Sequence, residues 1–344
     1  MFEVSIIIPV YNGEKWLDKC LQSLFIQSYN KPMELSLYND GSTDTTMTIL
    51  DDWRVRLEGR DIHVIVSGHT GQPRGVGFAK NTAVRQSSGK YLCFLDADDE
   101  MSERRIDKQL EAAKSSSNAL IGCKFHRVPE DSTIRFTKWA NNLTPHQLYT
   151  QMYTSHGPTV VMPTWFCKRG VFDRVGGFDE GGKGVPEDLI FFYRHVEMGG
   201  EVYRVDDDLM LYRYHPDAAT FSIKQETIWK IRIDFLEKQI LSHWPEFTIW
   251  NAGKQGRRFF RSLTDINQKK VCAFCDVDEK KIKKAVYIYE YSKEKYKPRI
   301  PIIHYSQAKP PIVICIKLDL TSGVFEENLR SLNLEEGKDF IHFN

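Results

Sequence analysis

The side chains best suited to chemistry in this sequence form an acidic cluster at the end of a short apolar stretch. Residues 91–100 read YLCFLDADDE, so an apolar run leads directly into Asp96, Asp98 and Asp99. Three carboxylates this close repel one another and are costly to bury without partners. A divalent cation removes that repulsion, and an Asp-x-Asp spacing suits Mg²⁺ or Mn²⁺, which proteins hold through a few carboxylates and substrate phosphates. A solvated acidic turn is the alternative, and the surrounding elements must decide between the two.

The elements that would position this cluster alternate between strand and helix patterns. β-Branched and apolar residues predict strands at 4–9, 33–38 and 63–66, and the run at 91–95 is a fourth. Amphipathic segments between them predict helices, the first of which Asn12 can cap. Four strands alternating with helices indicate a parallel α/β sheet, and such sheets bind ligands at the carboxyl ends of their strands.

Polar residues stand at three of these four predicted strand ends. They are Tyr11 with Asn12, then Asp40, and then the cluster Asp96–Asp99. Charge at a strand end is costly unless a ligand uses it. This coincidence favours a binding site over a solvated turn.

A second acidic candidate follows about ninety residues after the first. Glycines in 181–184 indicate a mobile loop, and the pair Glu187 and Asp188 then opens a predicted helix. Acids also suit the first turn of any helix, so capping is the structural alternative to a catalytic role for this pair. The segment 202–214 predicts one or two strands and leads to His215, for which a core histidine is the alternative to a metal ligand.

Composition bounds the classes that the chain can belong to. The 344 residues suit two domains, and a net charge of +1 advertises no general affinity for nucleic acid or membranes. The chain has no apolar run of membrane-spanning length, and its first residues do not resemble a secretion signal. Its seven cysteines lack the spacing of a disulfide framework. We therefore expect a reducing compartment, the cytoplasm or the nucleus.

The last third of the chain predicts a second, smaller α/β domain at 246–344, after a linker helix within 223–245. Its segment IWNAGKQGRR resembles the first turn of a Rossmann domain, with Asn251 in place of the first glycine and Asp276 where a ribose-binding acid would stand. Dinucleotide binding is thus open, but a Rossmann-like domain used for shape and contacts is favoured. The pair Cys272 and Cys275 lies in a predicted strand with the two side chains on opposite faces, which argues against zinc.

The second domain also contains the most basic region of the sequence. Such a cluster could contact an RNA backbone, and a solvated charged face is the alternative. The region comprises Lys254, Arg257, Arg258, Arg261, Lys269, Lys270, Lys280, Lys281, Lys283 and Lys284.

Taken in order, the motifs of the first domain resemble the family 2 inverting glycosyltransferases of the GT-A fold. The matching elements are VSIIIPVYNGEKWLDKCLQSL, LYNDGSTD, the AKN after the glycine loop, YLCFLDADD, GGFDE, PEDL and YRYH. The resemblance implies a GT-A domain at 1–222 followed by the Rossmann-like domain. Over its whole length the chain is similar to a subgroup described as transferring galactose to queuosine in tyrosine tRNA.

This resemblance assigns roles to individual positions. Asp98 and His215 would hold Mn²⁺ or Mg²⁺, Asp188 would be the catalytic base, and Asp99 is expected to be a helix-start acid. The family often has an acid where Asn39 stands and usually has arginine at position 80, where lysine loses the bidentate fork. The nucleotide sugar would be bound by Pro9, Tyr11, Asp40, Lys80, Asp96, Trp165 and Glu187.

The implied function is metal-dependent, inverting transfer of galactose from UDP-galactose to queuosine in the anticodon of tyrosine tRNA. The residue types fit, because a metal can neutralise the leaving diphosphate while Asp188 deprotonates the acceptor. Two alternatives remain open. One is a UDP-GlcNAc-dependent β-1,3-N-acetylglucosaminyltransferase acting on a glycan, and the other is a non-catalytic protein that binds a nucleotide sugar or RNA.

Overall fold

The computed structural model describes residues 2–344 and divides the chain into two compact units. The first unit comprises the described residues up to Leu148 together with Pro158–Lys224. The second unit comprises Tyr149–Gly157 together with Gln225–Asn344. The short segment Tyr149–Gly157 therefore belongs to the second unit, although residues of the first unit flank it in the sequence. Among the helices of these described residues, none is both long and apolar enough to cross a membrane.

An eight-stranded mixed sheet forms the core of the first unit, with the strand order β3-β2-β1-β4-β7-β6-β8-β5. The four strands predicted from the sequence are parallel neighbours, which confirms the α/β interpretation. Strand β7 is antiparallel to both β4 and β6, and β5 is antiparallel to β8. The strands are β1 (Val4–Val10), β2 (Met33–Asp40), β3 (Ile62–His69), β4 (Tyr91–Phe94), β5 (Glu100–Met101), β6 (Ala119–Val128), β7 (Phe166–Lys168) and β8 (Glu201–Arg213).

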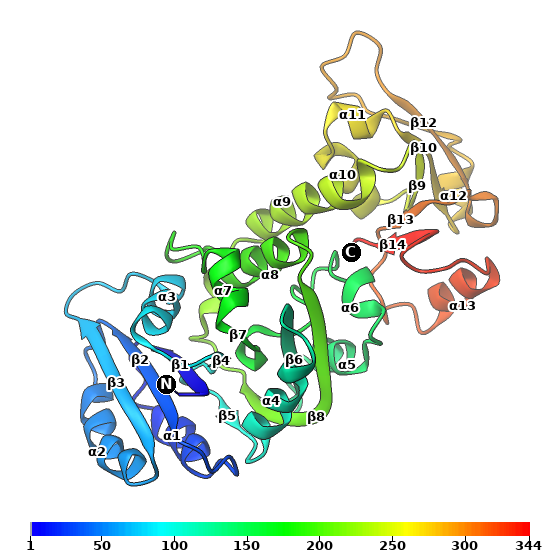
Figure 1. Ribbon diagram of the computed structural model, residues 1–344. Coiled ribbons are helices and arrows are strands. Elements are labelled where there is room, and N and C mark those ends of the chain that lie inside the picture. Colours follow the sequence, from blue (N-terminus) through cyan, green and yellow to red (C-terminus); the bar gives the residue numbers. More distant parts are fainter. Residues whose placement is uncertain (1) are drawn as a thin grey trace. The chain divides into compact units, whose positions relative to one another are not determined.

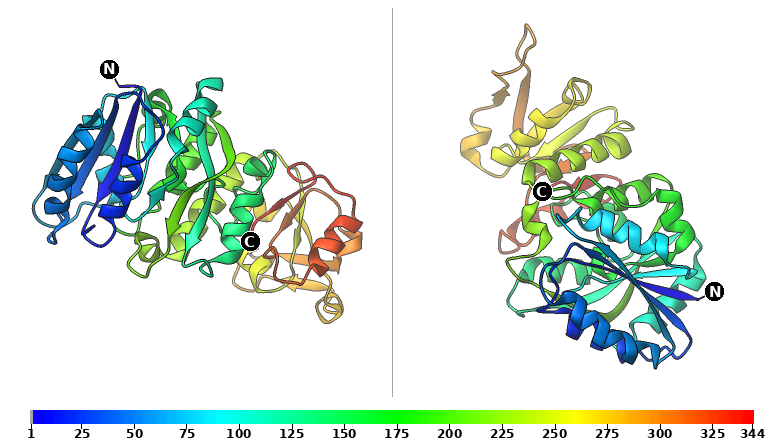
Figure 2. Two further views of the ribbon diagram at one scale, coloured as in Figure 1. Left: turned by 90° about the horizontal axis from the view of Figure 1, so that it is seen from below. Right: turned by 90° about the vertical axis from the view of Figure 1, so that its left-hand side faces the viewer.

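Helices cover both faces of the parallel half of this sheet. Helices α1 and α2 lie on one face of β1–β3, and α3 lies on the other (Figure 1; Figure 2, right). The α-helices of this part of the chain are α1 (Leu17–Phe25), α2 (Thr46–Glu58), α3 (Val76–Gln86), α4 (Arg105–Ser115), α5 (Ile134–Asn142), α6 (Gln147–Thr150), α7 (Arg169–Val175) and α8 (Glu187–Glu197). Short 3₁₀ turns occur at Met162–Thr164 and Ala219–Ser222.

The prediction that Asn12 caps the first helix is wrong. Helix α1 begins at Leu17, and Asn12 instead adopts a left-handed conformation with φ 51°. Its backbone N–H donates to Ser42 Oγ at 2.8 Å, and its side-chain oxygen accepts from the N–H of Thr43 at 2.9 Å. Asn12 therefore ties the loop after β1 to the loop after β2, at the carboxyl edge of the sheet.

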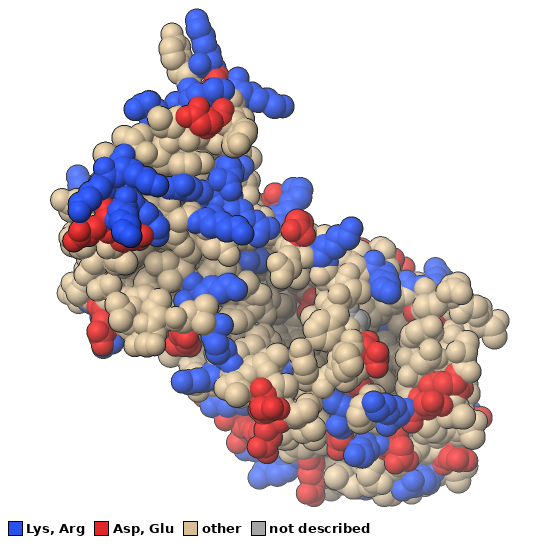
Figure 3. All heavy atoms as spheres, turned by 180° about the vertical axis from the view of Figure 1, so that it is seen from behind, with Lys and Arg blue, Asp and Glu red and all other residues tan. Residues whose placement is uncertain are grey.

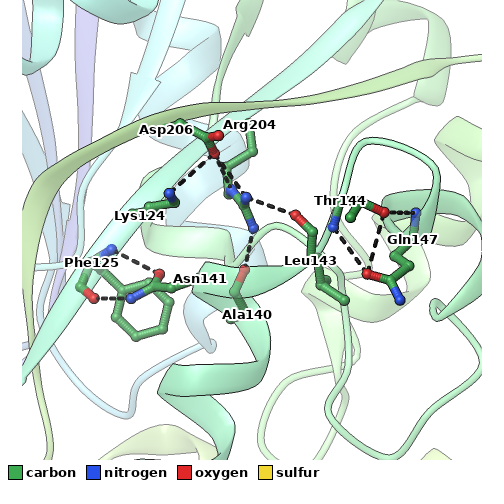
Figure 4. Close-up of polar contacts among 9 residues, drawn as sticks. All are labelled: Lys124, Phe125, Ala140, Asn141, Leu143, Thr144, Gln147, Arg204 and Asp206. Atoms are coloured by element: carbon green, nitrogen blue, oxygen red, sulfur yellow. Dashed lines mark hydrogen bonds and ion pairs between the residues drawn. The ribbon is translucent and has the colours of Figure 1, made fainter.

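A group of polar contacts fixes α5 against β6 and β8 (Figure 4). Arg204 of β8 donates to the carbonyl oxygens of Ala140 and Leu143 at 2.5 and 2.7 Å. A guanidinium at this position is favourable, because the carbonyls at the carboxyl end of a helix carry partial negative charge. Asn141 also exchanges two hydrogen bonds with the backbone of Phe125 on β6. These contacts hold helix α5 against the long strand β8, whose end carries the YRYH motif.

The second unit is an independent α/β layer with its own core. Its six-stranded sheet has the order β11-β12-β10-β9-β13-β14, with β11 alone antiparallel to its neighbour. The strands are β9 (Phe247–Trp250), β10 (Val271–Asp276), β11 (Val286–Ile288), β12 (Arg299–His304), β13 (Ile312–Ile314) and β14 (Phe340–His342). The helices are α9 (Gln225–Leu236) with a π turn (Glu237–Leu241), α10 (Lys254–Ser262), α11 (Asp265–Gln268), α12 (Glu279–Ile282) and α13 (Val324–Ser331), and Tyr305–Gln307 is a 3₁₀ turn.

Aromatic and branched side chains fill the core of this second unit. Trp250, Ile312 and Phe325 are among the residues buried together in it. In strand β10 the side chain of Cys275 is buried and that of Cys272 is exposed, which confirms that the two cysteines face opposite sides. A second α/β domain is thus present, as predicted.

Candidate active site

The acidic cluster lies where the sequence predicted it, immediately beyond the end of β4. Carboxylate oxygens of Asp96, Asp98 and Asp99 lie within 4.8 Å of one another. One oxygen of Asp96 and one of Asp99 are buried with no hydrogen-bond partner. Buried carboxylate oxygens are normally satisfied, and Nζ of Lys80 comes only to 3.7 Å from the Asp96 oxygen, so the cluster can accept a further cation.

Both predicted metal ligands lie together at this cluster. The imidazole Nε2 of His215 is 2.7 Å from Oδ2 of Asp98, although 117 residues separate the two in the sequence. Carboxylate oxygens suit Mg²⁺ and Mn²⁺, and a single imidazole is compatible with Mn²⁺. The residues present therefore fit a divalent cation held by Asp98 and His215.

Arg213 is a site residue that the sequence reasoning missed. Its Nε donates to the backbone oxygen of Asp98 at 2.9 Å, and its guanidinium pairs with the carboxylate of Glu100. The ring of Trp16 covers the guanidinium, with 4.3 Å between the ring centre and Cζ. Because side chains alternate along a strand, Arg213 and His215 both reach the cluster from the end of β8, and this two-residue spacing was the available signal.

Asp99 is not the helix-start acid that we expected. Helix α4 begins only at Arg105, and the side chain of Asp99 is fully buried. One of its oxygens accepts a hydrogen bond from the backbone N–H of Arg213 at 2.8 Å. Burial, together with the charges of Asp98 and Asp96, raises the pKa of Asp99 well above its ordinary value. Asp99 therefore anchors β8 beneath the cluster.

A buried lysine connects the cluster to the acidic pair of α8. Nζ of Lys80, on α3, lies 3.1 Å from Oε1 of Glu187 and 3.7 Å from Oδ1 of Asp96. Burial alone would lower the pKa of Lys80, but Asp96 and Glu187 outweigh it and raise that pKa. The charge of Lys80 is thus engaged by two carboxylates rather than presented to solvent.

Replacing Lys80 with methionine is expected to lower the free energy of unfolding by about 3 to 5 kcal/mol, because Glu187 would stay buried without its counter-ion. Urea unfolding measures this loss. The double variant Lys80→Met/Glu187→Gln should recover part of it, since Glu187 is then neutral and only Asp96 has lost its counter-ion. The exposed Lys19→Met is the matched control, and equal losses in the single and double variants would contradict the pairing.

Asp188 has the environment expected of a general base. It follows Glu187 in the first turn of α8, and one of its oxygens accepts from the N–H of Leu189 at 2.7 Å. Burial, with a further contribution from Glu187, raises the pKa of Asp188 from 3.8 to about 6. A carboxylate tuned toward neutrality is characteristic of a catalytic base, whereas a plain capping acid has a lowered pKa.

The ends of β1 and β2 place Tyr11 and Asp40 at the same edge of the sheet. Pro9 is buried within β1, and Tyr11 just beyond that strand is 49% exposed. Asp40 is buried, and its two oxygens accept from the N–H groups of Arg74 and Gly75 at 3.0 and 2.7 Å. Asp40 therefore shapes the glycine loop that precedes α3.

The glycine loop lies directly against the predicted mobile loop. Gly75 has φ +104°, and a Cβ at this position would lie only 2.8 Å from Cα of Gly182. A Cβ at Gly77 would likewise lie 2.1 Å from the backbone oxygen of Asp179. Glycine is required here because the two loops touch through their backbones.

Trp165 does not lie where a nucleotide sugar could contact it. Its side chain has no exposed surface, and its indole N–H donates to the backbone oxygen of Val160 at 2.8 Å. The rings of Phe178 and Phe191 pack around it. The structure thus argues against the predicted direct contact and makes Trp165 part of the hydrophobic support beneath the site.

The Rossmann-like turn of the second unit is occupied by its own side chains. Asn251, in place of the first glycine, accepts from the N–H of Gly253 at 2.7 Å and donates to the backbone oxygen of Cys315 at 2.9 Å. Asp276 accepts from the N–H of Ala252 and from Nζ of Lys281, each at 2.9 Å. The groups that would bind a dinucleotide are therefore already hydrogen-bonded within the turn. This favours a domain that serves through its shape and its surface contacts over one that binds a dinucleotide.

Comparisons with known proteins agree with this geometry. The family model described as "Glycosyl transferase family 2" matches residues 5–176. The uncharacterized glycosyltransferase EpsJ of Bacillus subtilis is 29% identical over 223 residues, which cover 63% of this chain and 62% of EpsJ, so the chain spans less than two thirds of that relative.

Solved structures show the same fold at low identity. The S. aureus TarS fragment 1–349 in complex with UDP-GlcNAc superposes with a TM-score of 0.54 at 16% identity, covering 77% of this chain and 71% of that one. The mannosyltransferase PcManGT from Pyrobaculum calidifontis, in complex with GDP-Man and Mn²⁺, gives 0.53 at 18% identity, covering 69% and 64%.

The fold and the acidic site together define a glycosyltransferase of the GT-A architecture. The match to the family model covers half of the chain, and this chain belongs to glycosyl transferase family 2.

Proposed function

We propose that this chain is a metal-dependent inverting enzyme that transfers galactose from UDP-galactose to queuosine in the anticodon of tyrosine tRNA. The observation that carries the reaction is the pairing of a cation site, Asp98 with His215, with a carboxylate of raised pKa, Asp188. The acceptor is supported by the whole-chain resemblance and by the basic region of the second unit.

The residues of the site suit a single in-line displacement at C1 of the sugar. Asp188 takes the proton of the acceptor hydroxyl as that oxygen bonds to C1. The bond between C1 and the diphosphate oxygen breaks, and the nucleoside diphosphate leaves with the electron pair. One displacement inverts the anomeric centre. A divalent ion, when bound by Asp98 and His215, neutralises charge on the leaving diphosphate.

The nucleotide would lie along the carboxyl edge of β1 and β2. Tyr11, the exposed aromatic residue beyond β1, would pack on the uracil ring, and Asp40 would hydrogen-bond the same base. Asp96 would lie beside the ribose, where its oxygen that lacks a hydrogen bond can accept one from a ribose hydroxyl. Lys80, which pairs with Asp96 and Glu187, would hold these two carboxylates at the nucleotide-sugar site.

The pKa of Asp188 is expected to set an acid limit to the reaction. A general base must be ionised, so kcat/KM should fall about tenfold per pH unit below the pKa of about 6 and be level at higher pH. The pH profile of the wild-type chain measures this limb. Glu187→Gln should move the limb to lower pH, because it removes a neighbouring charge that raises the pKa. A limb that does not move would contradict the assignment.

A second candidate is transfer of N-acetylglucosamine from UDP-GlcNAc to a glycan. The observation that favours it is the structural similarity to TarS, whose structure was solved with UDP-GlcNAc. A non-catalytic binding protein is disfavoured, because binding alone does not need a carboxylate of raised pKa such as Asp188.

The deciding experiment incubates the chain and Mn²⁺ with tRNA that contains or lacks queuosine, and with each of several UDP-sugars. Galactose transfer only to queuosine-containing tRNA is the expected result. Transfer only from UDP-GlcNAc, or transfer to queuosine-free tRNA, would contradict the proposal. We also propose a reducing compartment, the cytoplasm or the nucleus, because the seven cysteines lack the spacing of a disulfide framework.

A further inference from the structure

Positive charge in this protein is concentrated in one segment of the second unit. Residues 254–299 contain fourteen Lys and Arg against six Asp and Glu, a net charge of +8 in a chain whose total is +1. Lysine and arginine side chains gather densely over this unit (Figure 3, upper part). The ion pairs described in the segment take up only Lys269, Lys281 and Lys283, so most of this charge is uncompensated.

Basic helix α10 and aromatic strand β11 share one surface. The guanidinium of Arg257 lies 5.0 Å from the ring centre of Tyr287, and that of Arg261 lies 3.5 Å from the Tyr287 hydroxyl. Phe260 packs under Tyr287 and Tyr289 and fixes the helix to the strand. Helix α12 carries further lysines, one of which, Lys281, lies close to Gly253 at the start of α10.

The connection between β11 and β12 extends this surface as a projecting hairpin (Figures 1 and 2). Its two tyrosines, Tyr291 and Tyr296, are 88% and 80% exposed. Lys293, Lys295 and Lys297 are exposed beside them. Exposed aromatic rings interleaved with cations suit RNA, because unpaired bases stack on aromatic rings while cations contact phosphates.

We propose that α10, α12 and the hairpin 289–298, here called the basic tyrosine face, form a docking surface for RNA. Its Lys and Arg side chains contact phosphates, and Tyr291 and Tyr296 stack on unpaired bases. This inference rests on the proposed function for the choice of an RNA acceptor, but the binding itself requires no catalysis. An anionic membrane is the less suitable partner, because the projecting hairpin exposes tyrosine and lysine rather than aliphatic side chains.

Fluorescence anisotropy of the full chain with an unmodified tRNA transcript tests the basic tyrosine face. The variant Arg261→Glu/Lys280→Glu/Lys284→Glu should bind at least about tenfold more weakly and should show a shallower dependence of log affinity on log salt concentration. Tyr291→Ala/Tyr296→Ala should weaken binding about fivefold or more and leave the salt dependence nearly unchanged.

The matched control carries the same change of charge on exposed lysines of the first unit, Lys19→Glu/Lys114→Glu/Lys138→Glu, and should lose less affinity than the α10 and α12 variant. UDP affinity in all variants reports that the first unit is folded. Equal losses in the two charge variants, or binding only to phosphatidylserine vesicles, would overturn the docking surface. The proposed function would fail separately, through absence of transfer to a queuosine-containing tRNA that the wild-type chain binds.

Discussion

Replacing Asp188 with asparagine is expected to lower sugar transfer by about 10²- to 10⁴-fold, the usual contribution of general-base catalysis. Asparagine keeps the size of the side chain but cannot take the proton of the acceptor hydroxyl. UDP affinity should be unchanged, because Asp188 is not among the residues expected to contact the nucleotide. Transfer of labelled sugar and UDP titration measure the two quantities. The exposed Asp51→Asn is the control, and full transfer by Asp188→Asn would refute the base assignment.

The variant Asp188→Asn is also expected to change the thermal stability of the chain in a way that depends on pH. Because the pKa of Asp188 is about 6 in the folded chain and ordinarily 3.8, ionisation of this carboxyl disfavours the folded state. The stability that the protonated group contributes is complete below pH 3.8 and is lost as pH rises through 6. Asp188→Asn should therefore have an equal or higher Tm at pH 7.5, and this advantage should disappear near pH 4. A lower Tm at pH 7.5 would indicate a structural role.

Replacing Asp98 with asparagine is expected to remove the effect of metal on the enzyme. Asp98 lies 2.7 Å from His215 at the centre of the acidic cluster, so its loss takes a charged ligand from the proposed cation site. Metal stabilisation of a leaving diphosphate is worth several kcal/mol, so transfer should fall at least about 100-fold. UDP titrations with and without Mn²⁺ should show a metal-dependent gain in affinity for the wild-type chain only.

The variant Asp99→Asn is the control for the experiment on Asp98→Asn. Asp99→Asn alters a neighbouring carboxylate of the same cluster, but it disturbs the hydrogen bond to the backbone of Arg213. We therefore expect a loss of thermal stability with the metal-dependent gain in UDP affinity retained. If chelation of divalent ions leaves UDP binding by the wild-type chain unchanged, the metal role of Asp98 is wrong.

The parallel strands β1–β4 could be predicted because the residues that specify each strand lie close together in the sequence. Each of β1–β4 has its own apolar run and turn residues, and parallel pairing of the strands then brings their carboxyl ends to one edge. The positions of Tyr11, Asp40 and the acidic cluster at that edge followed from this rule. The resemblance to a family added His215 and Asp188, which no rule of spacing could have brought to the same place.

Other features depend on contacts between distant parts of the chain, so no short stretch of the sequence could establish them. The burial of Trp165 results from aromatic rings contributed by later segments, and Lys80 meets its carboxylate partners only when α3 and α8 lie against the end of β4. For Arg213 the local signal was its two-residue spacing from His215, and its role was decided only once the end of β8 was placed beside Asp98. The assignment of Tyr149–Gly157 to the second unit is of the same kind.

The sequence by itself thus determined which residue types carry the chemistry and which strand ends present them. Strand periodicity, turn residues and the clustering of carboxylates are properties of short stretches, so they can be recognised before the chain is folded. Only the tertiary structure decided which of these carboxylates are satisfied and which are left unpaired. Burial, and the pKa shifts and ion pairs that follow from it, depend on every element packed around a side chain, and no single stretch of sequence contains that information.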